Sequence, residues 1–337
     1  MPTLTDTEYA QETDRLLSAM SKVGWSRELC ELHAPLTLEI ERLKREQDAV
    51  VLAHSYQVPE ICYGVADFRG DSLALAQFGR TAKASKIVLA GVRFMAETAK
   101  ILSPEKTVLH PASDAGCSLS ESITAEDVRR LRAQHPGRPV VCYVNTSAAV
   151  KAEVDVCCTS ANAMQIINAL PDQEIVFIPD ALMAQNLQKL TTKRLIPWNG
   201  KCIVHESFSG EKLAAHRASF PDARIMVHTE CAPEVVGMAD LAGGTSDMMR
   251  YVRESGAKRF MVITECGLAD RMRIEFPDRE FVGACSLCPY MKRVDLANIR
   301  QVLTAPRPDQ VVEIEESVRV RAERSLTRML EIGASRD

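Results

Sequence analysis

Short apolar runs alternate with amphipathic stretches along most of the chain, and the first of them define a unit. The apolar runs at residues 49–54, 86–92 and 107–109 are short, which is typical of strands buried in a parallel sheet. Residues 73–81 and 95–102, which lie between these runs, have helical patterns. This order of elements predicts a small parallel sheet with helices on both faces.

The same order of elements occurs three times. In the middle strand, Ile87 corresponds to Ile175, 88 residues later, and Ile175 to Phe260, a further 85 residues on. Such a period indicates repeated structural units. We therefore expect an α/β fold of three similar three-layer αβα units with short parallel sheets, arranged with pseudo-threefold symmetry around a central site. The strands expected in the second and third copies are residues 139–145, 174–178, 195–196, 224–228, 259–263 and 280–282.

Helical patterns also occur at both ends of the chain, outside the three copies. Residues 1–47 are mostly polar, and residues 37–44 form an amphipathic stretch that should cover one face of the first unit. Residues 311–332 form a long amphipathic helix that should pack back on the first unit. The expected division is residues 1–117 for the N-terminal helices and first unit, 118–202 for the second unit, 203–291 for the third, and 292–337 for the segment that returns to the first.

Three cysteines recur with nearly the same period as the strands. Cys202 lies 85 residues after Cys117 and 86 residues before Cys288, and each follows the third strand of its copy in a polar loop. Three thiolates at one centre suit a [4Fe–4S] cluster with one open iron, or a Zn²⁺ ion with one open position. Spacing alone does not choose between them. Cys285 and Cys288 form a lone CxxC, and the period selects Cys288 as the ligand.

Polar residues gather where the predicted strands end, and in parallel sheets ligands bind beyond the carboxyl ends of the strands. Single residues at such positions are often structural, and hydroxyl residues at helix starts are first of all N-caps. Three helix N-termini aimed at one point would also bind carboxylates or phosphate. Glu230, two residues after His228, is a candidate general base among histidines. The strand-end residues are His54, Tyr143, Asn145 and His228, and the helix-start residues are Ser72, Ser160 and Thr245.

Composition narrows the class of protein. The 337 residues are 46% hydrophobic and 26% charged, with a net charge of −4, which favours a soluble globular protein and argues against a nucleic-acid surface. No apolar run approaches the roughly 18 residues of a membrane span, and no secretory signal is seen, so a cytoplasmic location without membrane partners is expected. The chain has 11 cysteines, an odd number, and shows no export signal. A disulfide framework is therefore not expected, and the thiols should be reduced. Neither a G-x-G-x-x-G nor a P-loop motif follows a strand, which argues against a dinucleotide-binding or P-loop protein.

Several stretches together resemble the quinolinate synthase family, iron–sulfur enzymes of de novo NAD biosynthesis. The resemblance covers residues 48–333 in unbroken order and is carried by residues 54–61, 66–73, 91–97, 143–146, 159–163, 198–206 and 288–291. It implies three α/β domains around a [4Fe–4S] cluster that is held by one cysteine from each. It also implies condensation of iminoaspartate (iminosuccinate) with dihydroxyacetone phosphate to quinolinate, phosphate and water. An L-aspartate oxidase or dehydrogenase would supply the imine.

The resemblance assigns roles to individual residues. The cluster ligands would be Cys117, Cys202 and Cys288. Glu230, Tyr143, His228, Tyr56 and His205 would be catalytic. The substrate would contact His54, Ser72, Tyr143, Asn145, Ser160, His228, Glu230 and Thr245.

Three positions depart from the family's pattern. Thr229 replaces the proline of the usual His-Pro-Glu-Cys, Gly244 replaces the first serine of Gly-Ser-Thr-Ser, and Ser55 stands where an aromatic or amide residue is common. These departures bear on substrate affinity more than on reaction type. Two alternatives stay open: a mononuclear zinc lyase that uses the same three thiolates, and a non-enzymatic iron–sulfur sensor. The sequence offers the sensor no DNA-binding helix pair or basic patch.

Overall fold

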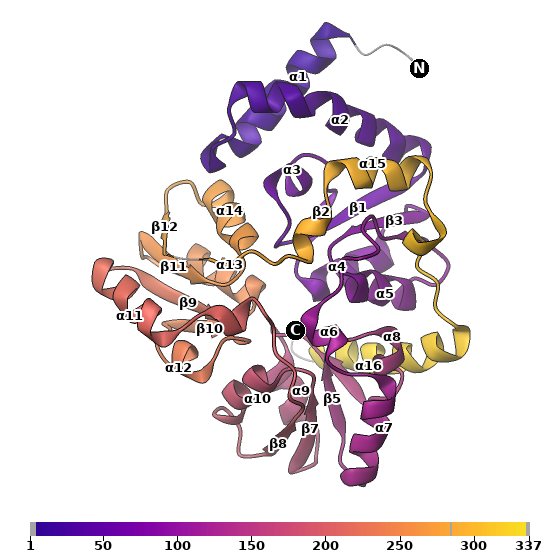
Figure 1. The fold of residues 1–337 in the computed structure, drawn as a ribbon, viewed down its shortest axis with the longest axis vertical. Helices are drawn as coiled ribbons and strands as arrows, with labels where there is room; N and C mark the ends of the chain where they lie inside the picture. The colour runs from indigo at the N-terminus through magenta and orange to yellow at the C-terminus, as the bar shows by residue number, and fades with distance from the viewer. Residues whose placement is uncertain (1–4, 284, 335–337) are drawn as a thin grey trace.

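The molecule is built around three separate four-stranded parallel sheets. A computed structural model describes residues 5–283 and 285–334 and shows the sheets arranged around a common centre (Figure 1). The strand orders are β2-β1-β3-β4, β6-β5-β7-β8 and β10-β9-β11-β12, so the topology is the same in all three. The expected α/β fold of three similar units is confirmed.

The elements of each unit follow one another in the predicted order. The first unit contains β1 (Ala49–His54), α3 (Pro59–Cys62), β2 (Phe68–Gly70), α4 (Ser72–Thr81), β3 (Lys86–Ala90), α5 (Arg93–Leu102) and β4 (Thr107–Leu109). The second contains α6 (Ser118–Glu121), α7 (Ala125–Gln134), β5 (Val140–Tyr143), α8 (Ala148–Lys151), β6 (Val156–Cys158), α9 (Ala163–Ala169), β7 (Glu174–Ile178), α10 (Ala181–Gln188) and β8 (Arg194–Pro197). The third contains η2 (His205–Ser207), α11 (Gly210–Ser219), β9 (Arg224–His228), α12 (Pro233–Val236), β10 (Leu241–Gly243), α13 (Thr245–Glu254), β11 (Arg259–Ile263), α14 (Cys266–Glu275) and β12 (Glu280–Val282).

Each sheet has one short edge strand that the sequence pattern did not predict. These strands, β2, β6 and β10, are three residues long and lie outside the apolar runs that the sequence pattern identified. The last residue of each pairs with the last residue of the first strand of its unit: Gly70 of β2 pairs with His54 of β1, and Gly243 of β10 pairs with His228 of β9. Ser72 and Thr245 follow two residues later. The edge strands therefore bring the helix starts beside the strand ends.

The helices outside the sheets divide between two units. The N-terminal helices α1 (Asp6–Met20), η1 (Ser21–Val23) and α2 (Arg27–Glu46) are followed at the other end of the chain by η3 (Met291–Arg293), α15 (Leu296–Thr304), η4 (Pro308–Gln310) and α16 (Glu316–Ala334). Helix α15 packs on α2 and β3 of the first unit, as expected for the returning segment.

The long C-terminal helix departs from the expectation. It begins at Glu316, and it packs mainly on β6, α8 and α9 of the second unit while also touching α5 of the first (Figure 1). Its apolar side chains Ala322, Leu326 and Met329 are buried, and the Ser325 hydroxyl donates to the Lys151 carbonyl of α8. The helix covers the face of the second sheet beside its edge strand, where buried apolar side chains need a cover.

One disulfide corrects the expectation that all thiols are reduced. Cys266 is bonded to Cys285, and the other nine cysteines are free. The two come together because Glu265 and Ser286 form an isolated parallel bridge next to them. No helix within residues 5–283 and 285–334 is long and apolar enough to cross a membrane.

Candidate functional site

One cavity opens where the three units meet, and every residue that the sequence analysis assigned to catalysis, substrate binding or the cluster lines it. Strand ends, helix starts and cysteine loops from all three units face it, because the sheets point their carboxyl ends inward. The predicted residues that line it are His54, Tyr56, Ser72, Cys117, Tyr143, Asn145, Ser160, Cys202, His205, His228, Glu230, Thr245 and Cys288.

The three cysteines occupy equivalent turns. Cys117, Cys202 and Cys288 are each partly exposed, whereas most of the other free cysteines are buried. Burial raises the pKa of each thiol, and two backbone N–H groups of the following turn oppose this by favouring the thiolate. The donors are the second and third residues after each cysteine: Leu119 and Ser120, Val204 and His205, and Tyr290 and Met291.

The same backbone contact sets the position of each cysteine loop. In each unit a helix follows the third strand in chain order: α5 follows β3, α10 follows β7 and α14 follows β11. The first residue of that helix donates its N–H to the carbonyl two residues before the cysteine. These bonds are Arg93 to Ala115 at 2.8 Å, Ala181 to Gly200 at 2.9 Å and Cys266 to Ser286 at 3.2 Å. The period seen in the sequence is therefore a repeated three-dimensional arrangement.

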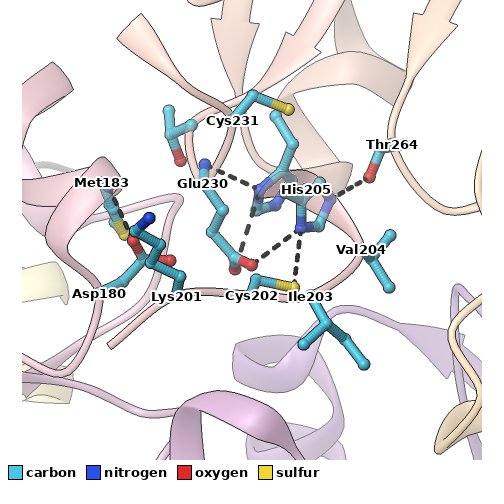
Figure 2. A network of polar contacts seen from close by, with 12 residues as sticks. Asp180, Met183, Lys201, Cys202, Ile203, Val204, His205, Glu230, Cys231 and Thr264 are labelled. Atoms are coloured by element: carbon cyan, nitrogen blue, oxygen red, sulfur yellow. Dashed lines mark hydrogen bonds and ion pairs between the residues drawn. The ribbon is translucent and has the colours of Figure 1, made fainter. Parts of the chain in front are cut away.

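Glu230 lies at the centre of a buried polar network beside Cys202 (Figure 2). The Tyr143 hydroxyl donates to its Oε1 at 2.5 Å, and its Oε2 lies 2.9 Å from Nδ1 of His205. Burial by itself would raise the pKa of this carboxyl, but His205, His228 and the two hydrogen bonds outweigh burial and lower it. Glu230 is therefore ionised and can accept a proton.

The network continues from His205 to the first unit. Its Nε2 lies 2.8 Å from the Thr264 hydroxyl, which lies 2.7 Å from the Tyr56 hydroxyl. On the other ring edge, Nδ1 also lies 3.2 Å from Sγ of Cys202. His205 therefore contacts the Glu230 carboxylate, the Thr264 hydroxyl and the Cys202 thiol.

His54 and His228 occupy matching turns at the ends of β1 and β9. Each accepts a backbone N–H at Nδ1, from Tyr56 at 3.2 Å and from Glu230 at 3.3 Å. Burial lowers the pKa of His54 to about 4 and that of His228 to about 3, so both rings are neutral near pH 7. With Nδ1 accepting, each neutral ring carries its proton on Nε2 and can donate it to a ligand.

The helix starts of the three units approach one another on the cavity wall. Ser246 donates to the carboxylate of Asp71 at 2.5 Å and links the third unit to the first. A Cβ atom at Gly244 would lie 2.3 Å from the Ser160 hydroxyl oxygen. A side chain at position 244 would therefore need the Ser160 hydroxyl to move.

The other two departures also have partners or surroundings in the structure. The Ser55 hydroxyl is buried and accepts from Arg271 at 2.7 Å. The hydroxyl of Thr229 is buried without a hydrogen-bond partner among the described residues, while its carbonyl accepts from Asn186 at 3.0 Å.

Sequence reasoning missed two residues of the site, Thr264 and Glu265. Glu265 is fully buried, accepts the N–H of Cys288 at 3.1 Å and pairs with Lys292 at 2.9 Å. Both residues follow the middle strand β11 directly, so the rule about strand ends would have found them. The loop of Cys288 therefore has an ionic anchor on this strand end.

Comparison with known proteins shows to which family the chain belongs. The family model described as "Quinolinate synthetase A protein" matches residues 38–331. The chain belongs to the quinolinate synthase family. Family members similar to it include the "Quinolinate synthase" of Xylella fastidiosa (strain Temecula1 / ATCC 700964), 50% identical over 87% of this chain and 86% of that protein. The "Quinolinate synthase 1" of Mesorhizobium japonicum is 48% identical over 94% of this chain and 96% of its own length, and the "Quinolinate synthase" of Agrobacterium fabrum is 47% identical over 95% and 90%.

Membership in the quinolinate synthase family places the chain among the iron–sulfur enzymes of NAD biosynthesis that form quinolinate. The sensor alternative therefore falls away as the protein's main role.

Proposed function

We propose that the central cavity condenses iminoaspartate with dihydroxyacetone phosphate, and that Cys117, Cys202 and Cys288 hold a [4Fe–4S] cluster there with one open iron. The observation that carries this proposal is the repeated cysteine turn. One partly exposed thiol from each unit faces the same cavity, and each has two backbone N–H groups directed at it. Hydrogen bonds to the sulfurs are a recognised feature of iron–sulfur sites.

The spacing of the thiols favours a cluster over a single zinc ion. Two thiolates on one Zn²⁺ lie at most about 4.6 Å apart, because each Zn–S bond is about 2.3 Å. Among the described residues, the three sulfur atoms do not all lie within 4.8 Å of one another. A cluster accepts wider spacing because each thiolate binds a different iron.

When bound, such a cluster supplies a Lewis acid at its open iron for a substrate hydroxyl or carbonyl. The chain's own residues bind and orient the substrates. The starts of α4 and α13 and the loop before α9 present hydroxyls and backbone N–H groups, which suit carboxylates and phosphate. The neutral rings of His54 and His228 offer Nε2–H donors to substrate oxygens.

Proton transfers fall to the buried network around Glu230. This carboxylate is ionised and already accepts the Tyr143 hydroxyl, so it can take a proton from substrate through Tyr143 or directly. His205, which contacts Glu230, and Tyr56, joined to it through Thr264, hold further exchangeable protons. The unstable imine would come from an L-aspartate oxidase or dehydrogenase.

The test is anaerobic analysis of iron and acid-labile sulfide in the purified chain, alongside a quinolinate assay. We expect about four iron and four sulfide per chain, and loss of both in Cys117→Ser, Cys202→Ser and Cys288→Ser. The control is Cys30→Ser, because Cys30 is a buried free thiol in α2, far from the cavity lining. Failure of the metal-free chain to take up iron and sulfide on anaerobic reconstitution, or full iron in all three ligand variants, would overturn the proposal.

A further inference from the structure

We propose that the cluster-free chain carries a site for a single zinc-class cation, formed by Sγ of Cys202, Nδ1 of His205 and a carboxylate oxygen of Glu230. These three ligand atoms all lie within 4.8 Å of one another. Nδ1 of His205 is 3.2 Å from the sulfur and 2.9 Å from Oε2 of Glu230. Within residues 5–283 and 285–334 this is the one group of three or more potential ligands so closely spaced.

The ligand types and their spacing suit zinc. Thiolate, imidazole and carboxylate bind Zn²⁺ at about 2.0–2.3 Å, which places neighbouring ligand atoms of a tetrahedron about 3.3–3.6 Å apart. The two distances from Nδ1 of His205 need to open by only a few tenths of an ångström, and the sulfur and the carboxylate oxygen lie within 4.8 Å of each other. Cys202 and His205 are three residues apart on one tight turn, and Glu230 comes from the end of β9. The fourth position faces the cavity and stays open, as in catalytic zinc sites.

The neighbours of these ligands already form a second layer of hydrogen bonds. Histidine ligands of metals generally donate their other ring nitrogen to a fixed acceptor, and here Nε2 of His205 faces the Thr264 hydroxyl at 2.8 Å. The Tyr143 hydroxyl occupies Oε1 of Glu230 and leaves Oε2 for the ion. On binding, the imidazole proton moves to Nε2, where Thr264 accepts its hydrogen bond, and the Cys202 thiol releases its proton to solvent.

A cation bound here would prevent the cluster from binding, because it uses Cys202, and would also occupy Glu230, the proposed catalytic base. The statement rests on the proposed function, in which Cys202 binds iron and Glu230 moves protons; the cation site itself rests on geometry alone. One sulfur cannot serve both centres in their separate geometries. We therefore expect Zn²⁺ to compete with cluster assembly at this corner of the cavity.

The direct test is anaerobic metal titration of the full-length, untagged chain after chelator treatment, without added reductant so that the Cys266–Cys285 disulfide stays intact. Co²⁺ is added first, because a thiolate–cobalt charge-transfer band reports sulfur ligation, and Zn²⁺ then displaces it. We expect one ion per chain, with weaker binding in His205→Ala and Glu230→Gln. The matched controls Cys117→Ser and Cys288→Ser each remove one cavity thiol and should bind the ion normally.

A second pair of variants tests the outer hydrogen bonds and avoids removing a ligand. Thr264→Val should weaken Zn²⁺ binding about 10–100-fold, the usual effect of losing such a partner. Thr229→Val is its control, because it also removes a buried threonine hydroxyl, but one that has no hydrogen-bond partner within residues 5–283 and 285–334. Circular dichroism of each variant establishes that it is folded.

The outcomes separate the site from the proposed function. Normal zinc affinity in folded His205→Ala and Thr264→Val, or loss of zinc in Cys117→Ser and Cys288→Ser, would overturn the cation site without affecting the cluster assignment. If the site exists, one equivalent of Zn²⁺ should prevent formation of the brown chromophore during reconstitution with iron and sulfide, and a chelator should restore it. Full chromophore with zinc retained would overturn the exclusion.

Discussion

Replacing Glu230 by glutamine separates the metal chemistry of the cavity from its proton chemistry. The side chain is 3% exposed and receives hydrogen bonds on both oxygens, from Tyr143 at 2.5 Å and His205 at 2.9 Å. Glutamine has nearly the same shape but has no charge, and it replaces one acceptor oxygen with a donor. Either Tyr143 or His205 therefore loses its partner.

The size of the effect follows from these contacts. A hydrogen bond to a charged group is worth about 1.5–3 kcal/mol, and the second bond weakens to a neutral one, so the positioning of the two partners should lose about 2–4 kcal/mol. Loss of a general base typically slows a reaction about 10²–10⁴-fold, or about 3–5 kcal/mol in barrier height. Quinolinate formation should fall within this range.

The assay measures quinolinate under anaerobic conditions together with the visible spectrum and iron content. None of the three proposed cluster ligands is altered in Glu230→Gln, so we expect a brown protein with normal iron that turns over very slowly. Cys202→Ser is the matched comparison from the same network and should lose both colour and activity.

Two results would refute this reasoning. A Glu230→Gln chain with normal turnover would remove the carboxylate from the proton-transfer steps. A colourless variant would show instead that Glu230 supports the cluster, through His205 and the Cys202 turn.

Three further predictions test other parts of the structure. Cys285→Ser should retain full iron and sulfide, because Cys285 is bonded to Cys266 and is not a proposed ligand; a loss as large as that of a ligand variant would contradict this. Ser160→Ala and Thr245→Ala should each raise KM tens-fold with iron intact, since one hydrogen bond to a charged group is worth about 1.5–3 kcal/mol; unchanged kinetics would make both hydroxyls structural. Burial lowers the pKa of His110 to about 4, so the unfolded chain takes up a proton below about pH 6.5 that the folded chain does not. Its contribution to the free energy of unfolding is therefore lost as pH falls from 6.5 towards 4, by about 2 kcal/mol at pH 5, and urea unfolding of His110→Asn at pH 7 and pH 5 should show a smaller difference than the parent chain.

The sequence by itself determined the repeated architecture and most of the residues proposed for the site. Strand runs and amphipathic helices are local patterns, and the repeat made the pattern of one copy a check on the next. Because equivalent loops of equivalent sheets point the same way, the offsets of Cys117, Cys202 and Cys288 were enough to place three thiols at one cavity. Strand ends identified His54 and His228 by the same argument.

Only the tertiary structure decided which segments make contact across the units. The edge strands β2, β6 and β10 were not apparent in the sequence, and each pairs with a longer neighbour in the structure. The amphipathic pattern of α16 shows that one face of the helix is buried. It does not show that this face packs on the second unit. The disulfide between Cys266 and Cys285 likewise depends on two loops lying side by side.

The contacts of single side chains depend most strongly on the assembled fold. The Thr264 hydroxyl contacts both His205 and Tyr56, and Tyr56 lies 208 residues before it in the sequence. The Ser160 hydroxyl lies where a side chain at position 244 would begin. Such contacts join residues from different units, and no local pattern records the distance between them. The sequence identified which residues face the cavity, whereas packing of the three units determined which of them bond to one another.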